Sequence, residues 1–249
     1  MLLKDKIAVI TGGAGINGLG FATARQMAAH GALVAILDLE RANPAAAAAS
    51  LGDRHLGLIA DVTDKAACDA AAAAIGKAFG RIDILINNAG ITQAAQTMDI
   101  TGADYDRILD VSLRGTLYMS QAVLPFMQQQ QAGSIVCISS VSAQRGGGIL
   151  GGPHYSAAKA GVLGLARAMA REFGAQGIRV NCVAPGLIET DIIQGKLSTE
   201  RKQDIASTIP LARLGRASDV AGACVFLGSD LSAYCTGITL DVNGGMLIH

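Results

Sequence analysis

The sequence lacks tryptophan, has few other aromatic residues and carries no excess of either charge. Its 20 basic side chains balance 20 acidic ones over 249 residues, so the formal net charge is zero. Proteins that bind nucleic acid or anionic membranes usually present a clustered basic face, and no such cluster occurs here. We therefore expect neither a nucleic acid nor a membrane surface as a partner.

Long hydrophobic runs are also missing, as is a leader-like segment. No apolar run approaches the ~18–20 residues that a membrane span needs, and the N-terminal residues pass directly into a strand-like run. The five cysteines are scattered and never in C-x-x-C spacing, which favours reduced, buried thiols over disulfides or a metal site. Together these absences predict a soluble, cytoplasmic protein.

Glycine, in contrast, is abundant and first gathers between Thr11 and Gly20, directly after a short apolar run at 6–11. A helical pattern follows to about residue 30, and a second apolar run at 33–37 is closed by Asp38. Strand, glycine loop, helix, strand and acid is the order of a dinucleotide-binding βαβ unit. Glycines let the backbone approach a pyrophosphate, and the start of the following helix attracts the phosphate charge.

Asp38 also indicates which nicotinamide cofactor is used. A carboxylate at this strand end accepts hydrogen bonds from the adenosine ribose and repels a 2′-phosphate. The loop from Gly12 to Gly20 contains no lysine or arginine that would bind such a phosphate, although Arg41 lies close in sequence and leaves NADP as an alternative. NAD is therefore the favoured cofactor.

Short apolar strands alternate with helix-like segments along most of the chain. Further strands are expected near 55–59, 82–86, 134–139 and 178–183, and helices near 42–51, 64–79, 102–130 and from Tyr155 onward. The alternation predicts an α/β fold, a single doubly wound (Rossmann) domain over 1–249 with a parallel sheet of about seven strands and helices on both faces. Ligands bind at the carboxyl ends of such strands.

Tyr155 and Lys159 begin the last long helical stretch and are four residues apart, so they share one helical face. A free phenol titrates near pH ~10 and is a poor acid or base at neutral pH. A neighbouring ammonium favours the phenolate and lowers the pKa of the tyrosine. The pair is therefore a candidate for general acid/base catalysis.

Taken together, the motifs resemble those of the short-chain dehydrogenase/reductase family over almost the whole chain. The matching pieces are Thr11-Gly12 with Gly18-Leu19-Gly20, Asp61, Asn87-Asn88-Ala89-Gly90, Ile138-Ser139-Ser140, Tyr155-x-x-x-Lys159, Pro185-Gly186, Pro210 to Gly215, Val225 to Leu227, and Thr236-Gly237 through Asp241 to Gly245.

The resemblance implies a role for each motif. Tyr155 would exchange a proton with the substrate oxygen, Lys159 would lower the pKa of Tyr155 and bind the nicotinamide ribose, and Ser140 would hydrogen-bond the reacting oxygen. The protein would position the groups, and the cofactor would carry the hydride. Cofactor contacts are expected from Gly12, Asn17, Gly18, Leu19, Asp38, Leu39, Asp61, Val62, Asn88, Ala89, Gly90, Tyr155, Lys159, Pro185, Gly186, Ile188 and Thr190.

The glycine loop departs from the family pattern, because five residues rather than three separate Gly12 from Gly18. Ile16 and Asn17 are therefore candidates for some of the phosphate contacts. A second departure lies in the long helix, where Ser112 stands at the position of an asparagine that holds a relay water in many relatives. Ser112 is a candidate catalytic residue in this altered relay.

The catalytic serine is open to two assignments. Counting thirteen residues back from Tyr155 reaches Ser142, whereas the strand register points to Ser140. We prefer Ser140, because a two-residue extension of the loop at 146–152 costs little. Ser142 then becomes a candidate substrate contact.

Other substrate contacts are expected from loops near the same sheet edge. Gln93 and His154 are candidates, as are Gln144 and Ile193. The irregular, charged segment at about 190–212 matches the substrate-covering flap of the family, which would exclude water during hydride transfer.

The helix that begins at Tyr155 is apolar on nearly every face. Such a helix is buried all round, so one side should cover the sheet and the other a partner subunit. Relatives are commonly tetramers, and we predict a homotetramer.

The sequence thus predicts an NAD(H)-dependent oxidoreductase for a small molecule with a secondary alcohol or ketone, with a polyol, sugar or hydroxy acid favoured. A 3-oxoacyl-thioester (acyl carrier protein) reductase is the alternative enzyme, although that role usually accompanies NADPH. A catalytically silent nucleotide-sensing protein is the alternative outside enzymes, and the presence of Ser140, Tyr155 and Lys159 together disfavours it.

Overall fold

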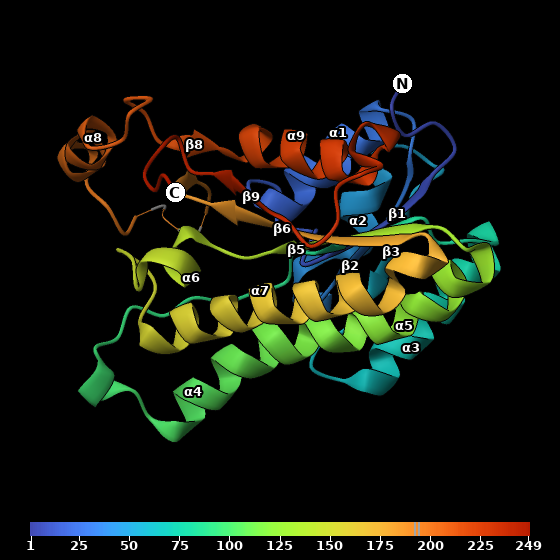
Figure 1. Ribbon diagram of the computed structural model, residues 1–249, viewed down its shortest axis with the longest axis horizontal. Helices are drawn as coiled ribbons and strands as arrows, with labels where there is room; N and C mark the ends of the chain where they lie inside the picture. Colours follow the sequence, from blue (N-terminus) through green and yellow to red (C-terminus); the bar gives the residue numbers. More distant parts are fainter. Residues whose placement is uncertain (192, 194) are drawn as a thin grey trace.

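A computed structural model describes residues 1–191, 193 and 195–249. Within these residues a parallel sheet of seven strands runs in the order β3-β2-β1-β4-β5-β6-β9 (Figure 1). The strands are β1 (Ile7–Thr11), β2 (Leu33–Asp38), β3 (Leu56–Ile59), β4 (Ile84–Asn87), β5 (Gly133–Ile138), β6 (Ile178–Pro185) and β9 (Thr239–Val242). The predicted doubly wound sheet is confirmed.

Helices cover both faces of the sheet, with α3, α5 and α7 on one side and α1, α2 and α9 on the other (Figure 1). The central strands are rich in β-branched residues, and side chains alternate between the two faces of the sheet along each strand. Val9 and Leu37 therefore join one apolar cluster, and Ile10 and Ile36 join the other. The helices are α1 (Leu19–Ala29), α2 (Pro44–Ala49), α3 (Lys65–Phe79), α4 (Gly102–Leu109), α5 (Gly115–Gln130), α6 (Val141–Arg145), α7 (Pro153–Phe173), α8 (Thr199–Ser207) and α9 (Ala217–Gly228).

Strand order reverses between β1 and β4, because the chain winds outward in one direction from β1 and then in the other from β4. The loops after these two strands consequently separate and leave a crevice at the carboxyl edge. In the ranges that the structure covers, no helix combines the length and apolar character needed to cross a membrane.

The predicted helix at 102–130 is present with one change. α4 and α5 are joined by a π turn at Asp110–Arg114 that contains Ser112. The Thr116 hydroxyl donates to the Ser112 carbonyl oxygen at 2.9 Å within this widened stretch. Such turns are frequent at functional sites.

The predicted flap is bounded by two short strands, β7 (Ile188–Glu189) and β8 (Gly215–Arg216), which pair in parallel. Between them lies α8, whose N-cap Ser198 accepts a hydrogen bond from the Arg201 amide at 3.2 Å. Positions 192 and 194 of the predicted flap lie outside the described residues.

Candidate active site

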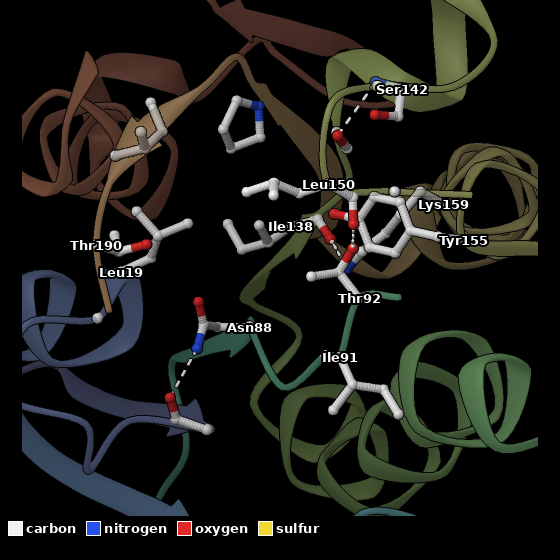
Figure 2. A pocket seen from close by; sticks show the side chains of 18 of the residues that line it. Leu19, Asn88, Ile91, Thr92, Ile138, Ser142, Leu150, Tyr155, Lys159 and Thr190 are labelled. Carbon is white, nitrogen blue, oxygen red and sulfur yellow. Dashed lines mark hydrogen bonds between the residues drawn. The ribbon is translucent and has the colours of Figure 1, made fainter. Parts of the chain in front are cut away.

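A cavity of about 1550 Å³ follows the carboxyl edge of the sheet from the glycine loop to the flap. Ligand pockets usually enclose about 300–1,000 Å³, so this cavity has room for a dinucleotide together with a substrate. Figure 2 shows Leu19 and Thr190 on one side of it and Tyr155 and Lys159 on the other.

At the nucleotide end, glycine is required by the close approach of two backbone segments. Gly12 has a left-handed φ of 62°, and a Cβ on it would lie 2.9 Å from the Ala89 Cα. A Cβ on Gly20 would lie 2.4 Å from the Gly12 carbonyl oxygen. Gly18 precedes α1 without a side-chain cap, so the first amides of the helix are available to an anion. These features fit the pyrophosphate of a dinucleotide.

The glycine loop is held against Asp38 by a hydrogen bond from its backbone. The Ala14 amide donates to Asp38 Oδ2 at 2.9 Å, and the Leu39 amide donates to Oδ1 at 2.8 Å. The carboxylate that faces the predicted adenosine ribose is therefore held by one backbone donor on each oxygen. Arg41 lines the same end of the cavity.

Asn17 does not line the cavity among the described residues. Its Nδ2 donates instead to Asp191 Oδ1 at 3.1 Å, which joins the glycine loop to the flap. The sequence predicted a phosphate contact for this side chain, and the structure gives it this interloop contact.

Asn88 joins the two strands that flank the crevice (Figure 2). Its Nδ2 donates to the carbonyl oxygens of Thr11 and Gly12 at 2.9 and 2.8 Å. The Thr11 hydroxyl oxygen accepts from the backbone amides of Asn88 and Ala89, each at 3.0 Å. The glycine loop therefore has a fixed position relative to the end of β4.

Lys159 lies beneath the ring of Tyr155, with Nζ 6.0 Å from the ring centroid. Its ammonium donates to the Ile138 carbonyl oxygen at 2.7 Å and is almost wholly buried. Burial lowers the pKa of Lys159 to about 8. The neutral amine form of Lys159 is therefore populated at mildly alkaline pH.

The pKa of Tyr155 differs from the expectation that Lys159 lowers it. Burial raises the pKa of Tyr155, because the phenolate loses its hydration, and a hydrogen bond from Ser140 opposes this rise. The expected lowering is therefore absent in the structure, where loss of water outweighs the favourable contacts of the phenolate.

The structure separates the roles of the neighbouring serines. Ser140 is the N-cap of α6, adjoins Tyr155 and accepts from the Ser142 amide at 3.1 Å. The Ser142 hydroxyl lies on the loop side, 2.7 Å from the position of a Cβ on Gly148. The Ser139 hydroxyl, which the sequence did not single out, donates to the Lys159 carbonyl oxygen at 2.9 Å. This geometry supports Ser140 as the partner of Tyr155.

Ser112 is fully buried, and its hydroxyl has no hydrogen-bond partner among the residues described. A Cβ on Gly90 would lie 3.6 Å from this hydroxyl and 3.2 Å from Lys159 Nζ. The absence of a side chain at Gly90 therefore leaves Ser112 and Lys159 near one another. Ser112 lies behind the described cavity wall rather than on it.

The structure brings most of the predicted site residues to one cavity. Gln93 and His154, both predicted as substrate contacts, are not among its described lining residues. The predicted residues that do line it are Gly12, Gly18, Leu19, Asp38, Leu39, Asp61, Val62, Asn88, Ala89, Gly90, Ser140, Ser142, Tyr155, Lys159, Pro185, Gly186, Ile188 and Thr190.

One part of the lining escaped the sequence prediction. An apolar wall is formed by Leu150, Leu187, Ile205 and Met246 around Ile193, which alone of these was expected from the sequence, and all five pack in one hydrophobic cluster. Arg201, Asp204 and Ile205 of α8 line the cavity together with Thr208, the residue that caps the C-terminal end of this helix. Their i, i+3, i+4, i+7 spacing marks one helical face and was the available signal in the sequence.

Comparison with known proteins gives consistent matches. The sequence model of the family described as Enoyl-(Acyl carrier protein) reductase matches residues 12–247. An uncharacterized short-chain type dehydrogenase/reductase of Sinorhizobium fredii is 60% identical over 253 aligned positions, which cover 100% of both chains.

Two more distant relatives carry an assigned activity. The 3-oxoacyl-(acyl-carrier-protein) reductase of Escherichia coli is 40% identical over 99% of both chains, and that of Thermotoga maritima is 38% identical over 100% of both. The crystal structure of gox2181 has a TM-score of 0.92 and 32% identity, and the match covers 98% of this chain and 96% of that one.

Proposed function

Because the chain belongs to the short-chain dehydrogenase/reductase family, we propose that it transfers a hydride between NAD and a secondary alcohol or ketone, with Tyr155 as acid and base. The observation that carries the proposal is the placement of Ser140, Tyr155 and Lys159 on the same cavity as Asp38. One sheet supplies both ends of that cavity, so we infer a single domain over residues 1–249. Substrate and cofactor are both small molecules in this proposal.

When bound, the nicotinamide accepts a hydride from the carbinol carbon or returns one to a carbonyl carbon. During oxidation the Tyr155 phenolate takes the hydroxyl proton, and during reduction the Tyr155 phenol gives a proton to the carbonyl oxygen. Ser140, beside the phenol, donates a hydrogen bond to the same substrate oxygen. The Lys159 charge favours the phenolate without touching the reacting atoms.

We assign NAD rather than NADP from the position and charge of the Asp38 carboxylate. Two backbone amides hold its carboxylate in place at the end of β2, where its negative charge opposes a 2′-phosphate. Arg41 at the same end of the cavity supports NADP as the alternative. Asp38 is expected to repel the 2′-phosphate of NADP, and Arg41 is expected to attract it.

The substrate class has two candidates. The choice of NAD favours oxidation of a polyol, sugar or hydroxy acid. The apolar wall and the activities named for the 38–40% identical relatives favour a 3-oxoacyl thioester. Since an apolar wall gains free energy only from apolar substrate atoms, the wall provides a direct way to compare them.

We also propose a homotetramer. The outward side of α7 exposes small residues, among them Ala157, Ala160, Gly164 and Ala168, and such a surface permits close contact with a second helix. Light scattering at micromolar concentration should give a tetrameric mass, and a monomeric mass would contradict the assembly.

Replacing Tyr155 by Phe keeps the ring and removes the acid/base group, so we expect kcat to fall at least ~100-fold while NADH binding, followed by fluorescence, changes little. Undiminished turnover of Tyr155→Phe would refute the assigned chemistry.

In the parent enzyme, alkaline pH should speed oxidation and slow reduction, because burial raises the pKa of Tyr155 and the phenolate forms only as pH rises.

Asp38→Asn removes the negative charge but keeps one oxygen that can accept a hydrogen bond from the glycine loop. Asp38→Ala would remove the charge and also the acceptors for both the Ala14 and the Leu39 amides, so Asp38→Asn is the cleaner test. We expect Asp38→Asn to reduce the ratio of kcat/KM for NAD to that for NADP roughly tenfold or more. Arg41→Ala is the matched variant and should leave NAD kinetics unchanged. A parent enzyme that prefers NADPH, with Arg41→Ala losing that preference, would reverse the assignment.

A series of alkan-2-ols of increasing length tests the apolar wall. Each buried methylene contributes about 0.8 kcal/mol, so kcat/KM should rise roughly fourfold per carbon, and Ile205→Ala should flatten this slope. Leu211→Ala is the control, because Leu211 lies on the flap but is 64% exposed. Polyols that outperform alkanols of equal carbon number would favour the polyol or sugar prediction.

A further inference from the structure

The first turn of α7 carries Tyr155 and begins with Pro153, which favours a helix start, but it lacks side-chain hydrogen bonds to its free amides. Its N-cap is Gly152, which provides no side-chain cap, and no acidic residue occupies the first turn. The preceding segment at 146–152 contains five glycines, and glycine leaves a chain with maximal backbone freedom. A group that exchanges a proton needs a defined position, so other contacts must order this turn.

His154 supplies a buried contact at this position. Its side chain is only 2% exposed, and its Nε2 lies 3.0 Å from Gln93 Oε1. The Gln93 Nε2 donates in turn to Asp104 Oδ1 at 3.0 Å. The Thr101 hydroxyl, which caps α4, donates to Asp104 Oδ2 at 2.5 Å. Side chains thus connect the first turn of α7 to the first turn of α4.

The direction of each hydrogen bond in this chain follows from the chemistry of its ends. An ionised carboxylate only accepts, so the Gln93 amide nitrogen faces Asp104 and its oxygen faces the imidazole. That oxygen also only accepts, so His154 Nε2 carries a hydrogen and donates. Hydrogen bonds from Thr101 and, to a smaller extent, Gln93 lower the pKa of Asp104, which keeps the carboxylate ionised as this series of hydrogen bonds requires.

The backbone just before α7 lies between Gln93 and the rings of His154 and Tyr155. The Gly152 amide donates to the Gln93 carbonyl oxygen at 2.8 Å. A Cβ on Gly152 would lie 3.0 Å from the His154 ring, and a Cβ on Gly151 would lie 2.4 Å from the Tyr155 ring. The two adjacent rings therefore lie against two adjacent glycines, and neither glycine position has room for a side chain.

Neither Gln93 nor His154 lines the described cavity, and His154 Nδ1 has no partner within the described part of the chain. An imidazole that is buried with one unpaired nitrogen is a costly choice for filling space alone. Its effect on the reaction has to pass through the residue next to it.

We propose that His154 is a positioning residue that, through Gln93 and Asp104, anchors the first turn of α7 to α4 and so holds the Tyr155 hydroxyl beside Ser140. The proposal rests on the acid/base role proposed above for Tyr155. His154 itself touches neither the substrate nor the cofactor.

The test compares His154→Phe, which keeps a ring of similar size but cannot donate, with His154→Gln, whose amide nitrogen can still donate toward Gln93. We expect His154→Phe to lower kcat roughly tenfold, the effect of about one hydrogen bond, with the KM for NADH unchanged. His154→Gln should recover most of the loss. His30→Phe, a partly exposed histidine at the end of α1, is the matched control and should behave as the parent.

Gln93→Ala provides a second, independent break in the same chain. Combined with His154→Phe it should cost no more than either change alone, because the link is already lost. Urea unfolding of each variant separates positioning from stability. Equal losses in kcat and in NADH affinity, in proportion to a lower urea midpoint, would overturn the proposal in favour of a merely structural role.

Tyr155→Phe is assayed in parallel. Full turnover of His154→Phe beside an inactive Tyr155→Phe would overturn the positioning role and leave the proposed function intact. Full turnover of Tyr155→Phe would overturn both.

Discussion

The junction between the ends of β1 and β4 is the constraint on which the site depends. Asn88 and Thr11 exchange hydrogen bonds across it, and the Asn88 amide also fixes the Gly12 carbonyl oxygen. β1 begins the half of the sheet that carries the glycine loop, and β4 begins the half that leads to Ser140 and Tyr155. These partly buried hydrogen bonds, together with the pairing of β1 with β4, therefore fix the glycine loop relative to the half that carries Ser140 and Tyr155.

Burial shapes the chemistry in the second half. Lys159 lies in the protein interior with its charge directed at a backbone carbonyl, and its pKa falls to about 8. Tyr155 is affected in the opposite sense, since burial disfavours its charged form. The same removal of water thus moves the pKa values of the two groups apart, because that of Lys159 falls to about 8 while that of Tyr155 rises above its ordinary value. In an exposed pair both groups would titrate near pH ~10. Burying two titratable groups destabilises their charged forms in the folded protein, and strongly shifted pKa values of this kind are typical of active sites.

The sequence was sufficient for the sheet and for the motifs at its carboxyl edge. Runs such as Ile7–Thr11 and Leu33–Asp38 are buried on both faces and bounded by glycine or acid, so their type and position follow from local pattern. The π turn at Ser112 could not be predicted from the sequence. It differs from the flanking α-helices only in which backbone carbonyl accepts each amide hydrogen bond, and the helical residue pattern continues through it. The side chains of Gln93 and His154 lie on segments far apart in sequence, and no local periodicity relates them. The hydrogen bond between Asn17 and Asp191 joins residues 174 positions apart, so no local pattern in the glycine loop predicts it.

The flap leaves the body of the protein at one place. Ile188 and Glu189 pair with Gly215 and Arg216, so the predicted flap begins and ends on a single short ladder. The entropy of closing a loop whose ends are already joined grows only slowly with its length. Insertions and deletions between these two strands therefore leave the sheet and the nucleotide end almost undisturbed. In evolutionary terms, this chain can acquire new substrates by exchanging one surface segment while its redox machinery is inherited unchanged.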